Sequence, residues 1–275
     1  MDKKSLCAAS IEDQKRIQLA ILEITDHFCR ENGIQYWLDS GTLLGAVRHQ
    51  GYIPWDDDID IGMLRSDFER FITTFNESNS RYQVICNELD RHCFYPYAKV
   101  VDTETVLYEP DENGLQLCIN IDIFVYDVTP DEEKSRRQYV LRDRLAFLNA
   151  AQFGLLRPKI WYKKMLLVFM RQMLHIFPKG FFAGKMVQNS RKYDGSNAEY
   201  VGNFTAFSKI LCSIHVFDSF LSGNFEGKSY PIPVGYDQWL RTFYGDYMVL
   251  PPVEERVTHH TKIAFFSRAE SAESL

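Results

Sequence analysis

Apolar residues in the first third of the chain recur at helical spacing in two places. Between residues 17 and 28 they stand three or four positions apart, which predicts an amphipathic helix. Ser10 with Asp13 three positions later is a capping pattern ahead of this helix, and Gly33 is typical of its end. A second helix is predicted to begin at Ser66 as its capping residue. Its apolar positions are Phe68, Phe71, Ile72 and Phe75.

Other segments alternate apolar and polar residues, which is the period of a half-buried strand. From Asp58 the chain reads Asp-Ile-Asp-Ile, so Ile59 and Ile61 are expected to face a core while the acids share the other face. The stretch 117–123 alternates in the same way and presents Asp122 on its polar side. Further strands are predicted at 34–38, 82–86, 95–101 and 105–108. These segments together predict a mixed sheet.

Four carboxylates crowd into the five residues Asp56-Asp57-Asp58-Ile59-Asp60. On a strand, Asp58 and Asp60 would lie roughly 6–7 Å apart. An ionised pair at that distance repels by about 2.5 kcal/mol at an effective dielectric constant near 20. A bound cation turns this cost into affinity, and hard oxygen donors favour Mg²⁺ or Mn²⁺, then Ca²⁺. We therefore predict a metal site with Asp56, Asp58 and Asp60 among its ligands.

Two other interpretations of the acidic run stay open. A solvated acidic turn is common for charge runs, although alternate isoleucines are wasted on an exposed turn. A calcium loop of the EF-hand type would use Asp56, Asp58 and Asp60 at loop positions one, three and five. That loop requires glycine at its sixth position and glutamate at its twelfth, where this chain has Ile61 and Asp67.

A strand, a tight turn and a helix are predicted around Ser40-Gly41-Thr42. Gly41 would let the backbone approach a ligand, and the free N–H groups at a helix start bind phosphate. The same tripeptide is also an ordinary helix cap. Arg48 and Lys99 are candidates to neutralise a phosphate, or else residues that flank a helix and a sheet.

Three further residues are candidates for the same site. Asp122 would donate a third acid from a second strand, the arrangement used by two-metal phosphoryl chemistry, or else is a lone surface acid. Trp55, next to the acidic run, offers a ring face to a quaternary ammonium, or else anchors a core. His259, in the pair His259-His260, is a candidate general base.

The stretch LDSGTLLGAVRHQGYIPWDDDIDIGM resembles the signature of the LicD family, bacterial phosphocholine transferases related to fukutin and fukutin-related protein within the nucleotidyltransferase-fold superfamily. Similar stretches follow at YAKVVDTET, INIDIFVYD and FEGKSYPIPVGYDQWLRTFYGDYMVLPPVEERVTHH, so the likeness runs from about Tyr36 to His260. By position, the resemblance implies that Gly41 and Thr42 form the phosphate-binding turn. The metal-binding acids that it implies are Asp58, Asp60 and Asp122.

The resemblance also implies a function. It is the metal-dependent transfer of phosphocholine from CDP-choline to a hydroxyl of a cell-surface glycan, a precursor of teichoic acid, lipopolysaccharide or capsule, with release of CMP. Two rivals stay open. One is an enzyme of the same fold that transfers a nucleotide, phosphoethanolamine or a polyol phosphate, and the other is a non-catalytic calcium-binding or scaffold protein.

The composition, 45% hydrophobic and 25% charged, is ordinary for a soluble globular protein. Six cysteines without C-x-x-C spacing indicate buried thiols in a reducing compartment. The first residues lack an apolar core of signal-peptide length, and the chain has no run of eighteen uncharged apolar residues. We expect a cytoplasmic protein that does not span a membrane, and no motif indicates nucleic-acid binding.

One segment departs from the acidic character of the chain. Residues 144–193 hold ten lysines and arginines and no acidic residue, whereas the whole chain carries a net charge of −6. Between Pro158 and Pro178, basic residues share one narrow face of a predicted helix and apolar residues the other. This pattern fits a helix lying on the anionic inner face of the plasma membrane, and it fits a core helix of a second domain equally well.

The expected fold is α/β or α+β. Residues 1–128 would form a mixed-sheet, nucleotidyltransferase-like catalytic core. Residues 129–275 would form a mostly helical accessory region that packs back on this core.

Overall fold

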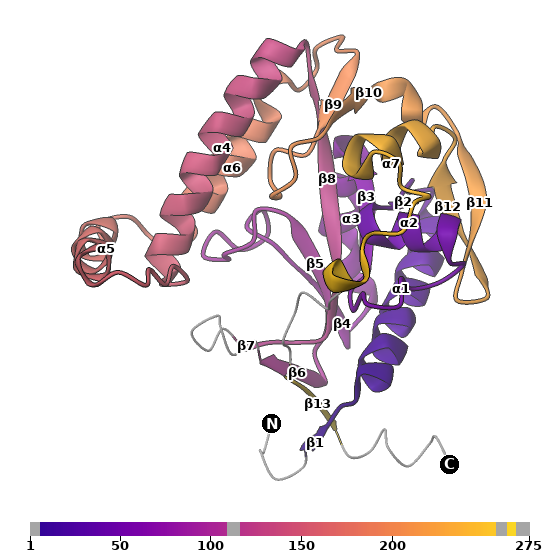
Figure 1. Ribbon diagram of the computed structural model, residues 1–275, viewed down its shortest axis with the longest axis horizontal. Helices are drawn as coiled ribbons and strands as arrows, with labels where there is room; N and C mark the ends of the chain where they lie inside the picture. Colours follow the sequence, from indigo (N-terminus) through magenta and orange to yellow (C-terminus); the bar gives the residue numbers. More distant parts are fainter. Residues whose placement is uncertain (1–5, 109–115, 257–262, 268–275) are drawn as a thin grey trace.

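The computed structural model describes residues 6–108, 116–256 and 263–267 (Figure 1). The helices are α1 (Ile11–Asn32), α2 (Ser40–Arg48), α3 (Arg65–Ser78), α4 (Glu132–Phe153), α5 (Trp161–Leu174), α6 (Phe181–Ser190) and α7 (Tyr236–Tyr244). The strands are β1 (Leu6–Ala8), β2 (Trp37–Leu38), β3 (Asp60–Leu64), β4 (Tyr82–Ile85), β5 (Ala98–Asp102), β6 (Thr105–Tyr108), β7 (Gln116–Leu117), β8 (Asn120–Thr129), β9 (Tyr200–Gly202), β10 (Leu211–Ser213), β11 (Phe220–Phe225), β12 (Lys228–Pro233) and β13 (Ile263–Ser267). This α/β arrangement confirms the predicted fold class.

A seven-stranded mixed sheet is built around the long strand β8. On one side β8 pairs in parallel with β3, which pairs in turn with β2. On its other side it pairs antiparallel with β5 near its start and with β9 near its end. Strands β4 and β10 complete the sheet at its edges. Two smaller sheets lie outside it, the hairpin β11–β12 and the set β1-β13-β6-β7.

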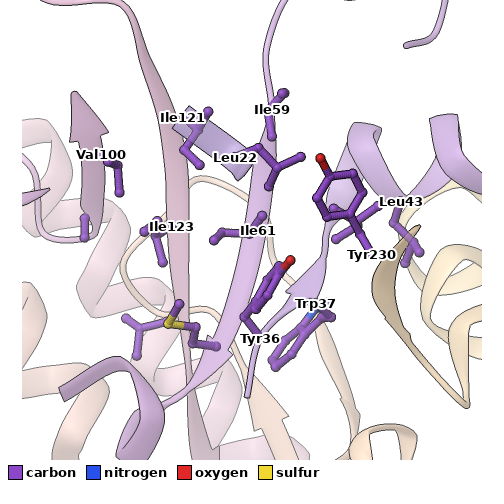
Figure 2. Packing of buried hydrophobic residues seen from close by; sticks show 14 of the residues in the cluster. Leu22, Tyr36, Trp37, Leu43, Ile59, Ile61, Val100, Ile121, Ile123 and Tyr230 are labelled. Atoms are coloured by element: carbon purple, nitrogen blue, oxygen red, sulfur yellow. The ribbon is translucent and has the colours of Figure 1, made fainter. Parts of the chain in front are cut away.

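The alternation along β3 and β8 decides which side of the sheet is apolar. Figure 2 shows Ile59, Ile61, Ile121 and Ile123 on the side where Leu22 of α1 packs. All five side chains are at most 1% exposed. Burying one such aliphatic side chain contributes about 1.5–3 kcal/mol, so this packing fixes which way the intervening acids point.

Helix ends follow local chemistry for the most part. The Ser10–Asp13 capping box is confirmed, and Gly33 ends α1 in the left-handed region with φ of 59°. Helix α7 ends at Gly245. Helix α3, in contrast, begins at Arg65 after Leu64, which makes no side-chain capping bond, so the predicted cap at Ser66 is wrong. The phenylalanines of α3 pack against Phe28 of α1, and this tertiary packing stabilises the helix without a capping side chain.

The second half of the chain extends the sheet as well as adding helices. Helices α4 and α6 lie side by side, and α5 projects at the outer end of α4 (Figure 1). Strands β9 and β10 join the main sheet, and α7 packs on α2. Trp239 and Leu240 of α7 belong to the same hydrophobic core as Trp37. Both sides of the predicted boundary at residue 128 therefore build one core, and the division into 1–128 and 129–275 stays a prediction.

Within the described ranges, none of the helices combines the length and the apolar character that a membrane span requires.

Candidate active site

A row of charged side chains crosses three neighbouring strands at one end of the sheet. Asp60, the first residue of β3, is the register partner of Asp122 on β8. Asp122 is in turn the partner of Lys99 on β5. The Asp122 N–H donates to the Ile59 carbonyl at 2.9 Å, which ties the two acidic strands together. The predicted position of Asp122 on a second strand beside the acidic pair thus matches the register of the sheet.

The acidic run just ahead of β3 gathers a second group of carboxylates. Asp56, Asp57 and Asp58 each offer an oxygen, and these oxygens lie within 4.8 Å of one another. Asp57 was not among the ligands predicted from the sequence, and this residue is buried, with 3% of its surface exposed. Its backbone carbonyl accepts hydrogen bonds from the amides of Gln14 and Gln18, at 3.3 and 3.0 Å. The sequence feature that indicates this contact is the pair of glutamines, which stand four positions apart on an otherwise apolar face of the helix.

The crowded acids perturb one another's pKa values. Burial, then the charges of Asp58 and Asp122, raise the pKa of Asp60 well above its ordinary value. Burial and the charge of Asp58 raise the pKa of Asp56 to about 7. At this separation each ionised carboxylate disfavours the ionisation of its neighbours, and a bound divalent cation offsets the repulsion. The donor set, all carboxylate oxygens, therefore fits Mg²⁺ or Mn²⁺.

The EF-hand interpretation is wrong. Asp60 opens an extended strand that reaches Leu64, and Asp67 lies beyond the far end of that strand in α3. At about 3.3 Å per residue, a five-residue strand separates its two ends by more than ~13 Å. Asp67 instead pairs with Arg70 at 3.2 Å.

The first turn of α2 lies directly against the acids. Ser40 has φ of 47°, in the left-handed region. This conformation is energetically unfavourable for any residue that carries a side chain, and it often marks a functional turn. A Cβ on Gly41 would lie 2.6 Å from Oδ2 of Asp56, so a larger residue there would displace this carboxylate. The buried hydroxyl of Thr42 accepts a hydrogen bond from the Asp60 N–H at 2.8 Å. Thr42 thus links the turn to the acidic strand, and its predicted contact with phosphate stays a prediction.

A buried carboxylate that sequence analysis missed lies under this turn. Asp39 is 0% exposed and accepts hydrogen bonds from Tyr126 Oη of β8 and, at 2.8 Å, from Trp239 Nε1 of α7. Burial raises its pKa. Asp39 therefore fixes α7, two hundred positions away, against the start of α2. Its place one residue before the turn was the only local signal.

Lys99 is largely enclosed. Its ammonium donates to the Asp122 carboxylate and, at 3.1 Å, to the Asn120 side chain. The same ammonium lies over the rings of Tyr95 and Tyr97, 5.0 and 5.5 Å from their centres. Those two rings therefore face the lysine cation.

Arg48 and Trp55 lie on the other side of the acids. Arg48 donates to the Tyr247 carbonyl at 2.5 Å, and burial lowers its pKa. Trp55 lies under the guanidinium of Arg256, 5.5 Å from its ring centre. Both residues line one cavity with Gly41. His259, the predicted base, lies outside the described residues.

The acids separate two cavities. The smaller, of about 290 Å³, contains Lys99 and Asp122, and the larger, of about 870 Å³, contains Gly41, Arg48 and Trp55. Asp58 and Asp60 line both. The loop between β9 and β10 contributes Ser208 to each cavity. No local sequence pattern indicates this contribution. Two ligands in the two cavities would meet at the carboxylates.

Comparison with known proteins places this geometry in a family. Residues 33–151 match the family described as LicD/FKTN/FKRP, nucleotidyltransferase domain. Over 264 residues the chain is 31% identical to the lipopolysaccharide cholinephosphotransferase LicD of Haemophilus influenzae, a match that covers 90% of this chain and 96% of that protein. The chain belongs to the LicD family. The predicted resemblance is thereby confirmed.

Shorter similarities connect this LicD family member to animal proteins. It is 38% identical over 61 residues to the human ribitol 5-phosphate transferase FKRP, covering 22% of this chain and 11% of FKRP. It is 34% identical over 59 residues to the mouse ribitol-5-phosphate transferase FKTN, covering 21% of this chain and 13% of FKTN.

Proposed function

We propose that this chain transfers phosphocholine from CDP-choline to a hydroxyl group of a cell-surface glycan, such as a lipopolysaccharide or teichoic acid precursor, with Mg²⁺ or Mn²⁺ as cofactor. The observation that carries the proposal is the position of Asp58 and Asp60 at the junction of two cavities. Similarity to the cholinephosphotransferase LicD along nearly its whole length supports the choice of transferred group.

The larger cavity suits the donor. Its volume of about 870 Å³ lies within the range of small-molecule sites. The first N–H groups of α2, at Gly41, have no partner inside the helix and can donate to a diphosphate, and Arg48 adds a positive charge on the same wall. These groups would hold the donor so that its β-phosphorus lies beside the acids.

The same cavity offers partners for a quaternary ammonium, which has no N–H to donate. Ring faces come from Trp55, Tyr244 and Tyr247, and carboxylates from Asp246 and Glu255. Cationic choline fits such a wall better than a neutral polyol does.

The carboxylates of Asp56, Asp58, Asp60 and Asp122 are the proposed metal ligands. A bound Mg²⁺ or Mn²⁺ would supply positive charge to the phosphoryl oxygens. In the smaller cavity, Lys99 holds Asp122 in place through its ion pair. A glycan hydroxyl in this cavity would face the donor across Asp58 and Asp60 and attack its β-phosphorus. A carboxylate of the acidic cluster would accept the hydroxyl proton, and CMP would leave with the electrons of the broken P–O bond.

A second candidate is transfer of a polyol phosphate. It is favoured by the similarity to FKRP and FKTN, named as ribitol phosphate transferases. That similarity spans about 60 residues, whereas the similarity to the cholinephosphotransferase LicD covers 90% of the chain, so we rank it below phosphocholine.

The test is a donor panel. The protein is incubated with CDP-choline, CDP-ethanolamine, CDP-ribitol or CTP, Mg²⁺ and a glycan extract. Release of CMP from the CDP donors, and of pyrophosphate from CTP, is followed by chromatography. We expect CMP from CDP-choline, dependent on both extract and Mg²⁺. CMP from CDP-ribitol alone would support the second candidate, and no turnover of any donor would refute a transferase function.

A further inference from the structure

Helix α5 stands apart from the rest of the molecule. It projects from the outer end of α4, at the left edge of Figure 1, away from the hairpin β11–β12. Leu174 is the one buried residue among those of α5. Leu174, with the half-buried Leu167 and Met170, forms a narrow seam against a small cluster under α4 and α6. The interpretation of this segment as a core helix is therefore wrong, because nearly all of the helix surface is open.

The open surface of α5 is apolar. Its large apolar side chains are exposed by more than half, and Ile176, just after the helix, is 75% exposed. These exposed residues are Trp161 (71%), Tyr162 (53%), Met165 (65%), Leu166 (65%), Val168 (59%), Phe169 (63%) and Met173 (54%). At about 100° per residue they cover an arc of roughly 160° centred opposite the seam. So broad and continuous an apolar face needs a partner.

Basic residues border this face. Lys164 and Arg171 lie between one edge of the arc and the seam, whereas Lys163 falls on the side of the seam. The surrounding segment 144–193 contains no acidic residue, while the chain as a whole is acidic. A broad apolar face bordered by cations is the pattern of a helix that lies flat in a lipid headgroup layer.

We propose that α5 binds the surface of an anionic lipid membrane, with its apolar face in the headgroup region and its lysines and arginine against lipid phosphates. Charge complementarity selects this partner. In a two-fold dimer the segment 144–193, which contains no acidic residue, would meet itself and offer no negative charge to its own lysines and arginines. A lipid surface instead places negative charge beside every basic residue at the edge of the face. This binding does not depend on which group the active site transfers.

The test is flotation of the full chain with vesicles, either of phosphatidylcholine alone or with added phosphatidylglycerol. We expect recovery with the anionic vesicles at low salt and its loss at high salt, because exposed charges are screened. The variant Lys164→Gln should bind anionic vesicles roughly fivefold more weakly, because it removes one charge at the edge of the apolar face.

A matched pair of variants tests the apolar face. Leu166→Asp/Phe169→Asp changes two exposed residues of α5, and Leu221→Asp/Val234→Asp changes two exposed residues at the hairpin β11–β12. The first should abolish recovery and the second should leave it unchanged, with circular dichroism showing that both are folded. Equal recovery with both vesicle types, or equal loss in both variants, would overturn the proposal. A vesicle-independent dimer that only the α5 variant disrupts, seen by sedimentation, would overturn it in favour of a second copy.

Discussion

The most informative perturbation of the acid cluster is Asp60→Asn, which keeps the shape of the side chain and removes its charge. Asp60 and Asp122 are register partners on adjacent strands, about 4.8 Å apart. At an effective dielectric constant near 20, their repulsion is roughly 3 kcal/mol when both are ionised. With a chelator present, the variant should therefore be more stable than wild type wherever Asp60 is ionised.

The pH dependence fixes the sign of this effect. Because the folded-state pKa of Asp60 is raised, the folded protein binds more protons than the unfolded chain between the ordinary value of 3.8 and the raised one. The stability of wild type should fall as pH increases through that window. The amide that replaces the carboxyl in Asp60→Asn does not titrate, so the advantage of the variant should be small below about pH 4 and grow toward roughly 3 kcal/mol in alkaline solution.

Urea unfolding at several pH values in EDTA measures this difference, and Mg²⁺ supplies the second half of the assay. At about ten times its dissociation constant, Mg²⁺ should stabilise wild type by about 1.4 kcal/mol and leave the variant unchanged. CMP release by the variant should be lost. Asp218→Asn, at a carboxylate whose side chain is 65% exposed, serves as control. Parallel pH profiles for wild type and Asp60→Asn, or activity of the variant within a few fold of wild type, would refute the reasoning.

Three further substitutions test the walls of the site. Gly41→Ala places a methyl group 2.6 Å from a carboxylate oxygen of Asp56. CMP release should fall at least about tenfold, while the melting temperature changes by a few degrees. Unchanged kinetics would show that the backbone or Asp56 shifts to accommodate the methyl group. Asp39→Ala leaves the indole N–H of Trp239 and one tyrosine hydroxyl unpaired; urea unfolding should show a loss of about 2–5 kcal/mol, and a loss below about 1 kcal/mol would contradict the proposed link. Trp55→Leu should lower the ratio of CDP-choline to CDP-ethanolamine use by a factor of roughly two to thirty, whereas equal loss for both donors would mean that this ring shapes the site without contacting the cation.

The acid row was predictable because it depends on local periodicity. The alternation around Ile59 and along 117–123 determines which side chains are buried, so the acids between them had to share the opposite face. The start of α1 was predictable for the same reason, since a capping box needs only four residues. The matching of Asp60 to Asp122 was not encoded locally, because register depends on how two distant strands pack.

The rest of the site depends on contacts that no local pattern contains. The hydrogen bond from Trp239 to Asp39 joins residues 200 positions apart. The guanidinium of Arg256 lies over the ring of Trp55, and these two residues are likewise far apart in the sequence. The exposure of α5 could not be predicted from the sequence either. The spacing of apolar residues is the same for a helix face that is buried in a core and for one that is exposed. Only the packing of α4 and α6 decides which side of α5 stays open.

The central claim is that the group transferred is phosphocholine, moved by attack at the β-phosphorus of the donor. The most direct measurement uses CDP-choline labelled with ¹³C in its methyl groups and lipopolysaccharide from cells grown without choline. After incubation with wild-type protein and Mg²⁺, the glycan is analysed by mass spectrometry. We expect glycan carrying labelled phosphocholine, CMP in solution in equal amount, and neither product with Asp60→Asn. Glycan carrying CMP, with labelled phosphocholine free in solution, would contradict it.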